Sequence, residues 1–484
     1  MTKRASFHVV TVGWEYPLVL HLWDRIAHKS EEHFSHILHP RHLKAQRPDS
    51  PRREDIHLLR DELRDPMPEA DRELLASLEQ PGVPTVHNMI RGDPVVSKIE
   101  PEAALGFATF LARRVRELFE QLHPSVVIGG FDGLHGSIAL AVARQLGIPW
   151  YALNFSVIPS GLACFCDRMS PAARVRFADR LPGGDQEFAE RWLRSFECRA
   201  VRAPAYVAPR PLSFAGELAN LRRRTQALVR TARNARERQH LQFTEARNRY
   251  SVRSVLRFFR RAAHARNAIA AYRAFERPPL VRYVLFGLHL QPESSIDVWA
   301  PFFANQLWVV ELLSRAIPPT HRLLVKIHKS DISNYSREQL DRMTSFPGVQ
   351  IVAPFSDTRA FIERADLVIT IQGTMGLEAA LLGKPVIVLG DSPLVEFPHV
   401  ARIGDLTELP TLVRRQLVAP AASRREIVNA YAAYLAPFLP ASYNDWTTVI
   451  SDAQIEDYVR LVAALRRHVL LGEAAVGARQ LTTS

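Results

Sequence analysis

Short apolar runs alternate with segments of helical spacing along most of the chain. Residues 7–13, "FHVVTVG", predict a strand, and residues 16–27 follow it with apolar positions at helical spacing. The clearest unit has a strand at 125–128, a Gly-rich loop, a helix from about 137 to 146 and a second strand at 149–153. Two strands joined through one helix are typical of a right-handed crossover in a parallel sheet.

The second half of the chain repeats this alternation. Strands are expected at 281–290, 322–328, 349–354 and 366–371, with helices at 305–317, 337–346 and 357–365 between them. We therefore expect the α/β class, with two doubly wound Rossmann-like domains that face a cleft. The expected parts are an acceptor-side domain at 1–215, an Arg-rich helical insertion at 216–275, a nucleotide-binding domain at 276–440 and a helical tail at 441–484.

Composition and charge narrow the classes of protein. A chain of 484 residues, 47% hydrophobic and 23% charged, suits a soluble protein of two domains. Three cysteines, Cys164, Cys166 and Cys198, form no disulfide framework and no zinc-ligand spacing, which favours a reducing compartment. The sequence shows no secretory signal and no apolar run of about 18 residues. We expect a cytoplasmic protein.

The net charge of +12 is concentrated in one segment. Residues 221–267 contain fourteen Arg and only two acidic residues, Glu237 and Glu245. They contain neither Gly nor Pro, which predicts one or two long basic helices. Such helices could rest on the inner membrane face or hold a polyanionic glycan, and they could equally be a solvated insertion that binds nothing. Nucleic acid is a weaker alternative, since no recognition motif accompanies the charge.

The stretch "VITIQGTMGLEAALLGKPVIVLG", residues 368–390, predicts a strand, a Gly-containing turn and a helix N-terminus. Gly373 permits close backbone approach, and Thr374 is expected to cap the helix. The amides that follow can bind an anion, helped by the helix dipole, and Glu378 one turn later can accept hydrogen bonds from a ribose diol. The alternative is a purely structural turn in which Glu378 completes a capping box around Thr374.

Polar side chains follow three other predicted strands. Gln291 and Glu293 flank a proline after the strand at 281–290, and Lys326 and His328 end the strand at 322–328. Ser356 follows the next strand. These groups suit contacts to a nucleotide and its phosphates, although turn chemistry and a structural histidine are the plainer alternatives. Two neighbours, Asn305 and Gln306, are weaker candidates that could equally cap the next helix.

These segments together resemble a known family. "LHLQPESS", "RLLVKIHKSD", "PFSDTRAFIERADLVITIQGT" and "GTMGLEAALLGKPVIVLG" occur in the order found in the bacterial capsule polysaccharide biosynthesis family, which includes Kdo transferases. The resemblance covers residues 281–389 and implies a GT-B glycosyltransferase with a nucleotide-sugar donor, CMP-Kdo being the nearest implied. In place of the family's His-Pro, the chain has His328 followed by Lys329, so UDP-, GDP- and other CMP-sugars stay open. The donor-site residues so implied are Gln291, Glu293, Lys326, His328, Ser356, Gly373, Thr374 and Glu378.

Groups that could act on an acceptor hydroxyl follow strands of the first half. Glu15 lies in "GWEYP", and Asp132 and His135 lie in "GGFDGLHG". A carboxylate or imidazole there can serve as general base, although Asp132 could instead shape the turn and His135 could cap the helix. Asp-x-Asp pairs are absent, which favours a mechanism without metal or cofactor, in which helix amides, Lys and His meet the charge of the leaving nucleotide.

The sequence thus favours transfer of a sugar from a nucleotide donor to a surface polysaccharide or its lipid-linked precursor. The enzyme would stay in the cytoplasm, with peripheral contact to the inner membrane face through residues 221–267. Two alternatives stay open: a nucleotide-sugar 2-epimerase of the same fold, and a non-catalytic assembly factor that binds polyanions.

Overall fold

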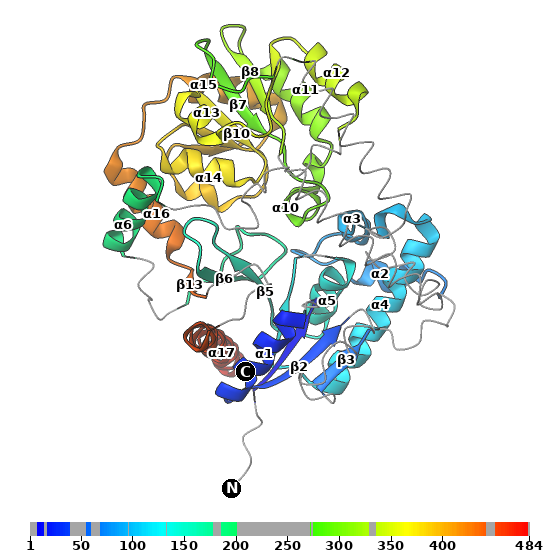
Figure 1. The fold of residues 1–484 in the computed structure, drawn as a ribbon. Helices are drawn as coiled ribbons and strands as arrows, with labels where there is room; N and C mark the ends of the chain where they lie inside the picture. The colour runs from blue at the N-terminus through cyan, green and yellow to red at the C-terminus, as the bar shows by residue number, and fades with distance from the viewer. Residues whose placement is uncertain are drawn as a thin grey trace, which may run out of the picture. The chain divides into compact units, whose positions relative to one another are not determined.

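A computed structural model of the chain folds into two compact units, each built on its own β-sheet (Figure 1). The first unit comprises Met1–Phe188 with Leu435–Ser484, and the second comprises Ala189–Tyr434. The structure describes residues 7–13, 17–38, 55–59, 68–94, 96–131, 133–177, 185–200, 272, 274–328, 335–441 and 451–482.

The first unit contains a seven-stranded sheet of order β13-β6-β5-β4-β1-β2-β3. Strands β1 to β5 pair in parallel, and β6 and β13 extend the β5 edge in antiparallel pairs. The residues of β1 are all buried, as expected for an inner parallel strand with both faces covered. The strands are β1 (His8–Val12), β2 (His33–Leu38), β3 (Ile56–Leu58), β4 (Val126–Gly129), β5 (Trp150–Phe155), β6 (Leu162–Cys166) and β13 (Leu439–Pro440).

Helices from both ends of the chain cover the first sheet. Trp23 of α1 packs in one buried cluster with Tyr458 and Leu461 of α17, and Arg25 forms an ion pair with Asp452 at 2.7 Å. The expected helical tail is therefore part of the first unit's core. The helical elements are α1 (Pro17–Lys29), α2 (Arg72–Ser77), α3 (Val86–Gly92), η3 (Val96–Lys98), α4 (Pro101–Leu122), α5 (Leu134–Gln145) and α17 (Asp452–Thr482).

The second unit contains a six-stranded sheet in which every pair is parallel, of order β12-β11-β10-β7-β8-β9. The chain adds β8 and β9 on one side of β7, then returns and adds the other three strands on the opposite side. This order is that of a Rossmann sheet. The strands are β7 (Tyr283–Gly287), β8 (Arg322–Lys326), β9 (Val349–Val352), β10 (Leu367–Thr370), β11 (Val386–Val388) and β12 (Val400–Arg402).

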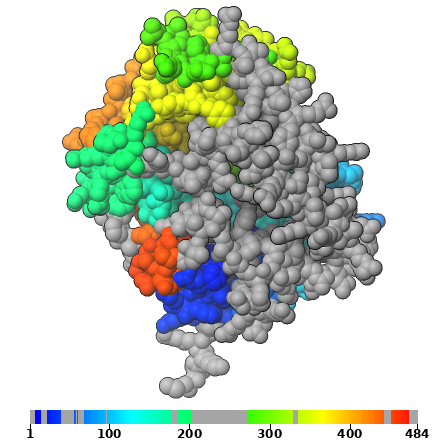
Figure 2. Space-filling model, in the orientation of Figure 1, coloured from blue at the N-terminus to red at the C-terminus, as the bar shows by residue number. Residues whose placement is uncertain are grey.

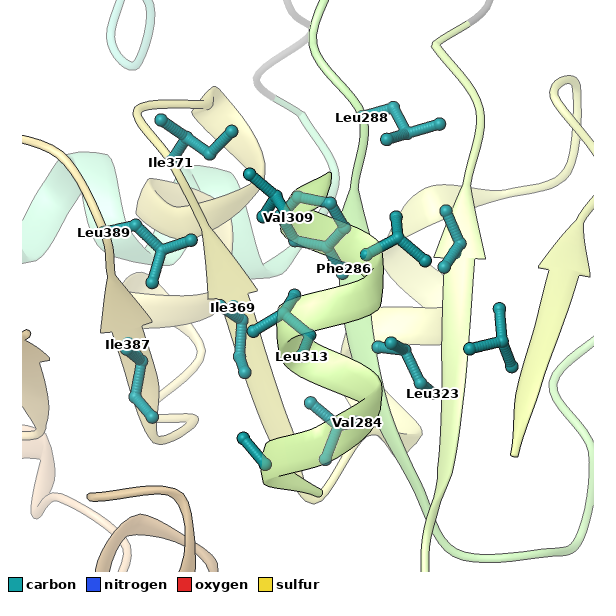
Figure 3. Close-up of a cluster of buried hydrophobic side chains, with 14 of the residues drawn as sticks. Val284, Phe286, Leu288, Val309, Leu313, Leu323, Ile369, Ile371, Ile387 and Leu389 are labelled. Carbon is teal, nitrogen blue, oxygen red and sulfur yellow. The ribbon is translucent and has the colours of Figure 1, made fainter. Parts of the chain in front are cut away.

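Apolar faces of helices pack on this sheet. Figure 3 shows Val309 and Leu313 of α11 directed at the strands, where they meet Phe286 and Ile369 in one buried cluster. The helical elements are α6 (Gln186–Glu197), α10 (Ser294–Asp297), η6 (Pro301–Phe303), α11 (Gln306–Ala316), α12 (Arg337–Ser345), α13 (Thr358–Arg364), α14 (Thr374–Leu381), η8 (Pro393–Glu396), η9 (Leu406–Glu408), α15 (Leu409–Leu417) and α16 (Arg424–Leu435).

Charged side chains join α6 to α13 and α16, and Figure 2 shows α6, in green, adjoining the yellow and orange segments of the second unit. The Arg359 guanidinium lies over the Phe196 ring at 4.6 Å from its centroid and donates to the Glu197 carbonyl at 3.1 Å. Arg424 forms ion pairs with Glu190 and Glu197 at 3.0 and 2.7 Å. These contacts fix α6 beside the outer helices of the second unit.

The predicted α/β class with two Rossmann-like domains is confirmed. The predicted strands and helices of 281–371 all form, with ends within a few residues of those expected. The Arg-rich segment at 221–267 and the expected boundary at residue 215 lie outside the described residues. Within the part of the chain that the structure describes, no helix has both the length and the mean hydropathy needed to cross a membrane.

Candidate functional site

The carboxyl edge of the second sheet brings together the four motif segments found in the sequence. The strand order reverses between β7 and β10, so the loops after these adjacent strands leave toward opposite faces of the sheet. Such a reversal is where open α/β sheets bind their ligands. Because β7, β8, β9 and β10 are parallel, the polar residues that follow them all belong to this edge.

A buried histidine joins the two loops at the reversal. His289, 6% exposed, follows β7, and its Nε2 accepts a hydrogen bond from the backbone N–H of Gln372 after β10 at 3.1 Å. The next amide, that of Gly373, donates to Thr370 Oγ1 at 2.9 Å. A Cβ on Gly373 would lie 3.1 Å from both His289 Nε2 and Thr370 Oγ1. Glycine therefore lets the turn sit against the imidazole.

The turn leads into α14 with a cap different from the one expected. Gly373 is the N-cap of α14 and Thr374 its first residue, so the prediction that Thr374 caps the helix was wrong. The Gly373 amide instead donates to the hydroxyl of Thr370, the last residue of β10. The N-cap is a glycine and so makes no side-chain hydrogen bond to α14. The first amides of a helix have no partner inside the helix, so those of α14 are suited to an anion.

A chain of carboxamide hydrogen bonds orders the loop after β7. Gln306, buried at the start of α11, accepts from the His289 amide at 2.6 Å and donates to the His289 carbonyl at 3.0 Å. It also donates to Gln291 Oε1 at 2.9 Å, and Gln291 donates onward to Asp297 at 2.8 Å. The Glu293 carboxylate is exposed and accepts from the Ser295 hydroxyl at 2.6 Å. Both predicted polar residues of the Gln-Pro motif are thus anchored within their own loop.

Lys326 ties the loop after β9 to the end of β8. Its ammonium, buried with the side chain, donates to the carbonyls of Ala353 and Pro354 at 3.1 Å and to Ser356 Oγ at 3.0 Å. Ser356 Oγ in turn donates to the Ala353 carbonyl at 2.7 Å. The Ser356 carbonyl lies 3.4 Å from the same ammonium, so its three protons face at least four acceptors. The contacts favour a role for Lys326 and Ser356 in shaping the edge rather than in touching a phosphate.

Two predicted residues at the edge, His328 and Glu378, are half-buried. His328 follows β8, and its charge contributes to lowering the pKa of His289, so the two imidazoles are electrostatically coupled. Glu378 lies on α14, one turn beyond Thr374. Lys329, the cation expected beside His328, lies outside the described residues.

The loops after β1 and β4 converge in the first unit in the same manner. That sheet reverses its order between β1 and β4, and a Cβ on Gly13 after β1 would lie 3.1 Å from His135 Nε2 after β4. His135 is the second residue of α5, whose N-cap is Gly133, so it does not cap the helix. The other two expected catalytic residues, Glu15 and Asp132, lie outside the described residues.

Two residues of these edges, His289 and Asp93, were not found from the sequence. His289 stands two positions before Gln291 in a motif read for its Gln and Glu. Gln306 was a weaker candidate for a ligand contact or a helix cap, and Asn305 takes the role of cap. Asp93, after α3, accepts from the Leu134 amide at 2.9 Å and so occupies the N-terminus of α5. Only the polarity of these positions inside apolar surroundings could have indicated them.

Among the described residues, no three His, Cys, Asp or Glu side chains form a group that could hold a metal ion. Cys164 and Cys166 are buried free thiols on β6, as expected, and Cys198 is exposed. A hydrogen bond with Cys164, together with burial, raises the pKa of the Cys166 thiol.

Solved structures with a similar fold include two of different activity. One is KpsC of Thermosulfurimonas dismutans, described as a beta Kdo 2,7 transferase, at 14% identity, a TM-score of 0.32, and coverage of 72% of this chain and 89% of that one. Another is a putative UDP-N-acetylglucosamine 2-epimerase of Listeria monocytogenes, at 11% identity, a TM-score of 0.30, and coverage of 96% and 97%. At these values neither similarity assigns an activity to this chain. No curated protein sequence matches it.

The sequence match is more specific than these likenesses. Residues 197–436 match the family described as "Capsule polysaccharide biosynthesis protein". The matched range contains the whole sheet of the second unit and all four motif segments at its carboxyl edge. This match confirms the resemblance to capsule polysaccharide biosynthesis proteins that the four ordered motifs predicted.

Proposed function

We propose that the protein is a glycosyltransferase that binds a nucleotide-sugar donor at the carboxyl edge of the second sheet and passes the sugar to a surface polysaccharide or its lipid-linked precursor. The observation that carries this proposal is the convergence of the family's motif segments where β7 and β10 reverse the strand order. A phosphate would meet the amides of Thr374 and Met375 and the dipole of α14, while Glu378 would accept from the ribose.

The leaving nucleotide carries the charge that the site has to stabilise. Helix amides that are already oriented supply part of this stabilisation without reorganisation during the reaction. His328, half-buried, follows β8 on the same edge, and its imidazole can donate to a phosphate oxygen. CMP-, UDP- and GDP-sugars all present this phosphate chemistry, and CMP-Kdo is the donor that the motif resemblance favours.

The acceptor hydroxyl needs a base, which we assign to the loops after β1 and β4 of the first unit. His135 is placed against Gly13 at the reversal of that sheet, and Glu15 and Asp132 flank the same loops in sequence. An imidazole or carboxylate there would accept the proton as the hydroxyl attacks the anomeric carbon. The basic segment 221–267 would hold the anionic acceptor or the membrane surface that carries it.

A transfer assay tests this function. The full chain is incubated with CMP-Kdo and with UDP- and GDP-sugars, each with and without a capsular oligosaccharide acceptor, and products are identified by mass spectrometry. We expect a lengthened oligosaccharide and release of one nucleotide that depends on the acceptor. A new nucleotide sugar formed without acceptor would instead identify an epimerase. Absence of any product, with glycan binding retained, would support the assembly factor.

A further inference from the structure

We propose that His289, held in place by Gln306, is a positioning residue that fixes the turn at Gln372 and Gly373 and thereby aims the first amides of α14 at the ligand. The geometry of the turn is a property of the free protein. That the ligand is the phosphate of a nucleotide sugar rests on the proposed function.

The backbone amides on either side of the start of α14 are held by hydrogen bonds. The Gln372 N–H is taken by His289 Nε2 and the Gly373 N–H by Thr370 Oγ1. The Gly376 amide donates back to the Gly373 carbonyl at 3.0 Å. The amides of Thr374 and Met375, the first two of the helix, lie between these fixed points and have no partner within the helix itself. The side chains that fix the turn therefore decide the direction in which these amides point.

Gln306 holds His289 in place. The backbone N–H and carbonyl of His289 are both bonded by the single carboxamide of Gln306, which is 4% exposed. The Gln306 side chain thus makes the two backbone hydrogen bonds that a neighbouring strand would otherwise make to His289. The side chain of His289 then crosses to the loop after β10, so one buried polar chain connects α11, the β7 loop and the β10 turn. Breaking it leaves buried polar groups without partners, which is costly.

The contact with Gln372 sets the tautomer of the His289 imidazole. Nε2 can accept from Gln372 only while that nitrogen carries no proton, so the neutral ring is protonated at Nδ1. Burial, aided by the charge of His328, lowers the pKa of His289 from 6.5 to about 4. The ring is therefore neutral at neutral pH and remains an acceptor.

Two substitutions separate positioning from bulk. His289→Gln keeps a side-chain oxygen near the position of Nε2, whereas His289→Leu fills similar space and cannot accept. Amide hydrogen exchange is measured on the full chain, without ligand, over peptides that contain Gln372 and Gly373. We expect exchange there at least about tenfold faster in the Leu variant and close to wild type in the Gln variant. Equal exchange in the Leu variant and the wild type would overturn the proposal.

Nitrogen NMR of ¹⁵N-histidine protein gives a second readout that requires only His289→Gln to fold. Among the 18 histidines, the signal that disappears in His289→Gln belongs to His289. We expect Nδ1 to be protonated and Nε2 to be the acceptor at pH 7. A ring protonated at Nε2 would refute the assignment even if His289→Leu failed to fold.

Binding of CMP tests whether the turn affects the ligand. The affinity is measured by titration under conditions in which the wild type and both variants are equally folded. We expect affinity to fall about tenfold in His289→Leu and to recover in His289→Gln. Full affinity in a folded Leu variant would contradict the proposal. If CMP, UDP and GDP all fail to bind the wild type, the proposed function fails, while exchange and NMR still decide the role of His289.

Discussion

Replacing Gly376 with valine is expected to destabilise the second unit by about 3 kcal/mol or more. Gly376 lies in the first turn of α14, and a Cβ there would be 2.6 Å from Thr370 Cγ2 and 2.9 Å from Leu394 Cδ1. Thr370 is buried within β10 and cannot move aside. The helix would have to shift away from the strand, which would also break the bond between Thr370 and the Gly373 amide.

Alanine at position 376 sets a gain in helix propensity against the steric contact. Alanine favours a helix over glycine by about 1 kcal/mol, whereas overpacking a buried contact costs about 1–3 kcal/mol. We therefore expect Gly376→Ala to lower the melting temperature despite its better helix propensity. Gly404→Ala is the control, because its Cβ would meet nothing within 4 Å. A melting temperature of Gly376→Val equal to that of the wild type would show that α14 does not sit against β10 as described.

Replacing Lys326 with methionine is expected to lower the free energy of unfolding by about 3 kcal/mol. The ammonium donates to Ala353, Pro354 and Ser356, and removing it leaves these buried acceptors with no donor from β8. Methionine retains the apolar stem, so the loss reports on the hydrogen bonds. We expect the loop at 353–356 to exchange its amides faster, which hydrogen exchange measures directly.

A second lysine of the same unit provides a matched control for Lys326. Lys384, half-buried, donates to the single carbonyl of Ala365 at 3.3 Å. Lys384→Met should therefore cost no more than about 1 kcal/mol. Equal effects of the two substitutions would mean that the loop after β9 does not depend on Lys326. A Lys326→Met variant that kept its stability and lost only nucleotide affinity would instead indicate that Lys326 contacts the nucleotide sugar.

The sequence predicts elements best where local patterns suffice. The apolar runs of β7 and β10 and the glycine before α14 each appear within ten residues of chain, and the order of the four motifs indicates which edge carries the site. The start of α5 was expected at about residue 137, but the helix begins at Leu134. Gly133, at a φ of 81°, precedes it, and Asp93 from 41 residues earlier holds the Leu134 amide. A cap supplied from so far away leaves no local signal.

Roles of polar side chains were harder to predict for the same reason. Lys326 has the charge of a phosphate ligand, yet its partners lie 27 to 30 residues later in the chain. Thr374 has a hydroxyl that could cap the helix, yet the Gly373 amide of the turn donates to the Thr370 hydroxyl. His289 and Gln306 matter through partners on other strands and helices. Residue type and spacing thus located the edge, while tertiary contacts determine which groups face a ligand.

The most direct test is whether the carboxyl edge of the second sheet binds a nucleotide with the help of Glu378 on α14. The melting temperature of the full chain is measured with CMP-, UDP- and GDP-sugars for the wild type, for Glu378→Ala, and for Glu338→Ala, whose exposed carboxylate is on α12. A ligand that binds only the folded state raises this temperature by mass action. The account predicts that one nucleotide class stabilises the wild type and Glu338→Ala but not Glu378→Ala. Stabilisation of all three alike, or of none up to millimolar ligand, would contradict it.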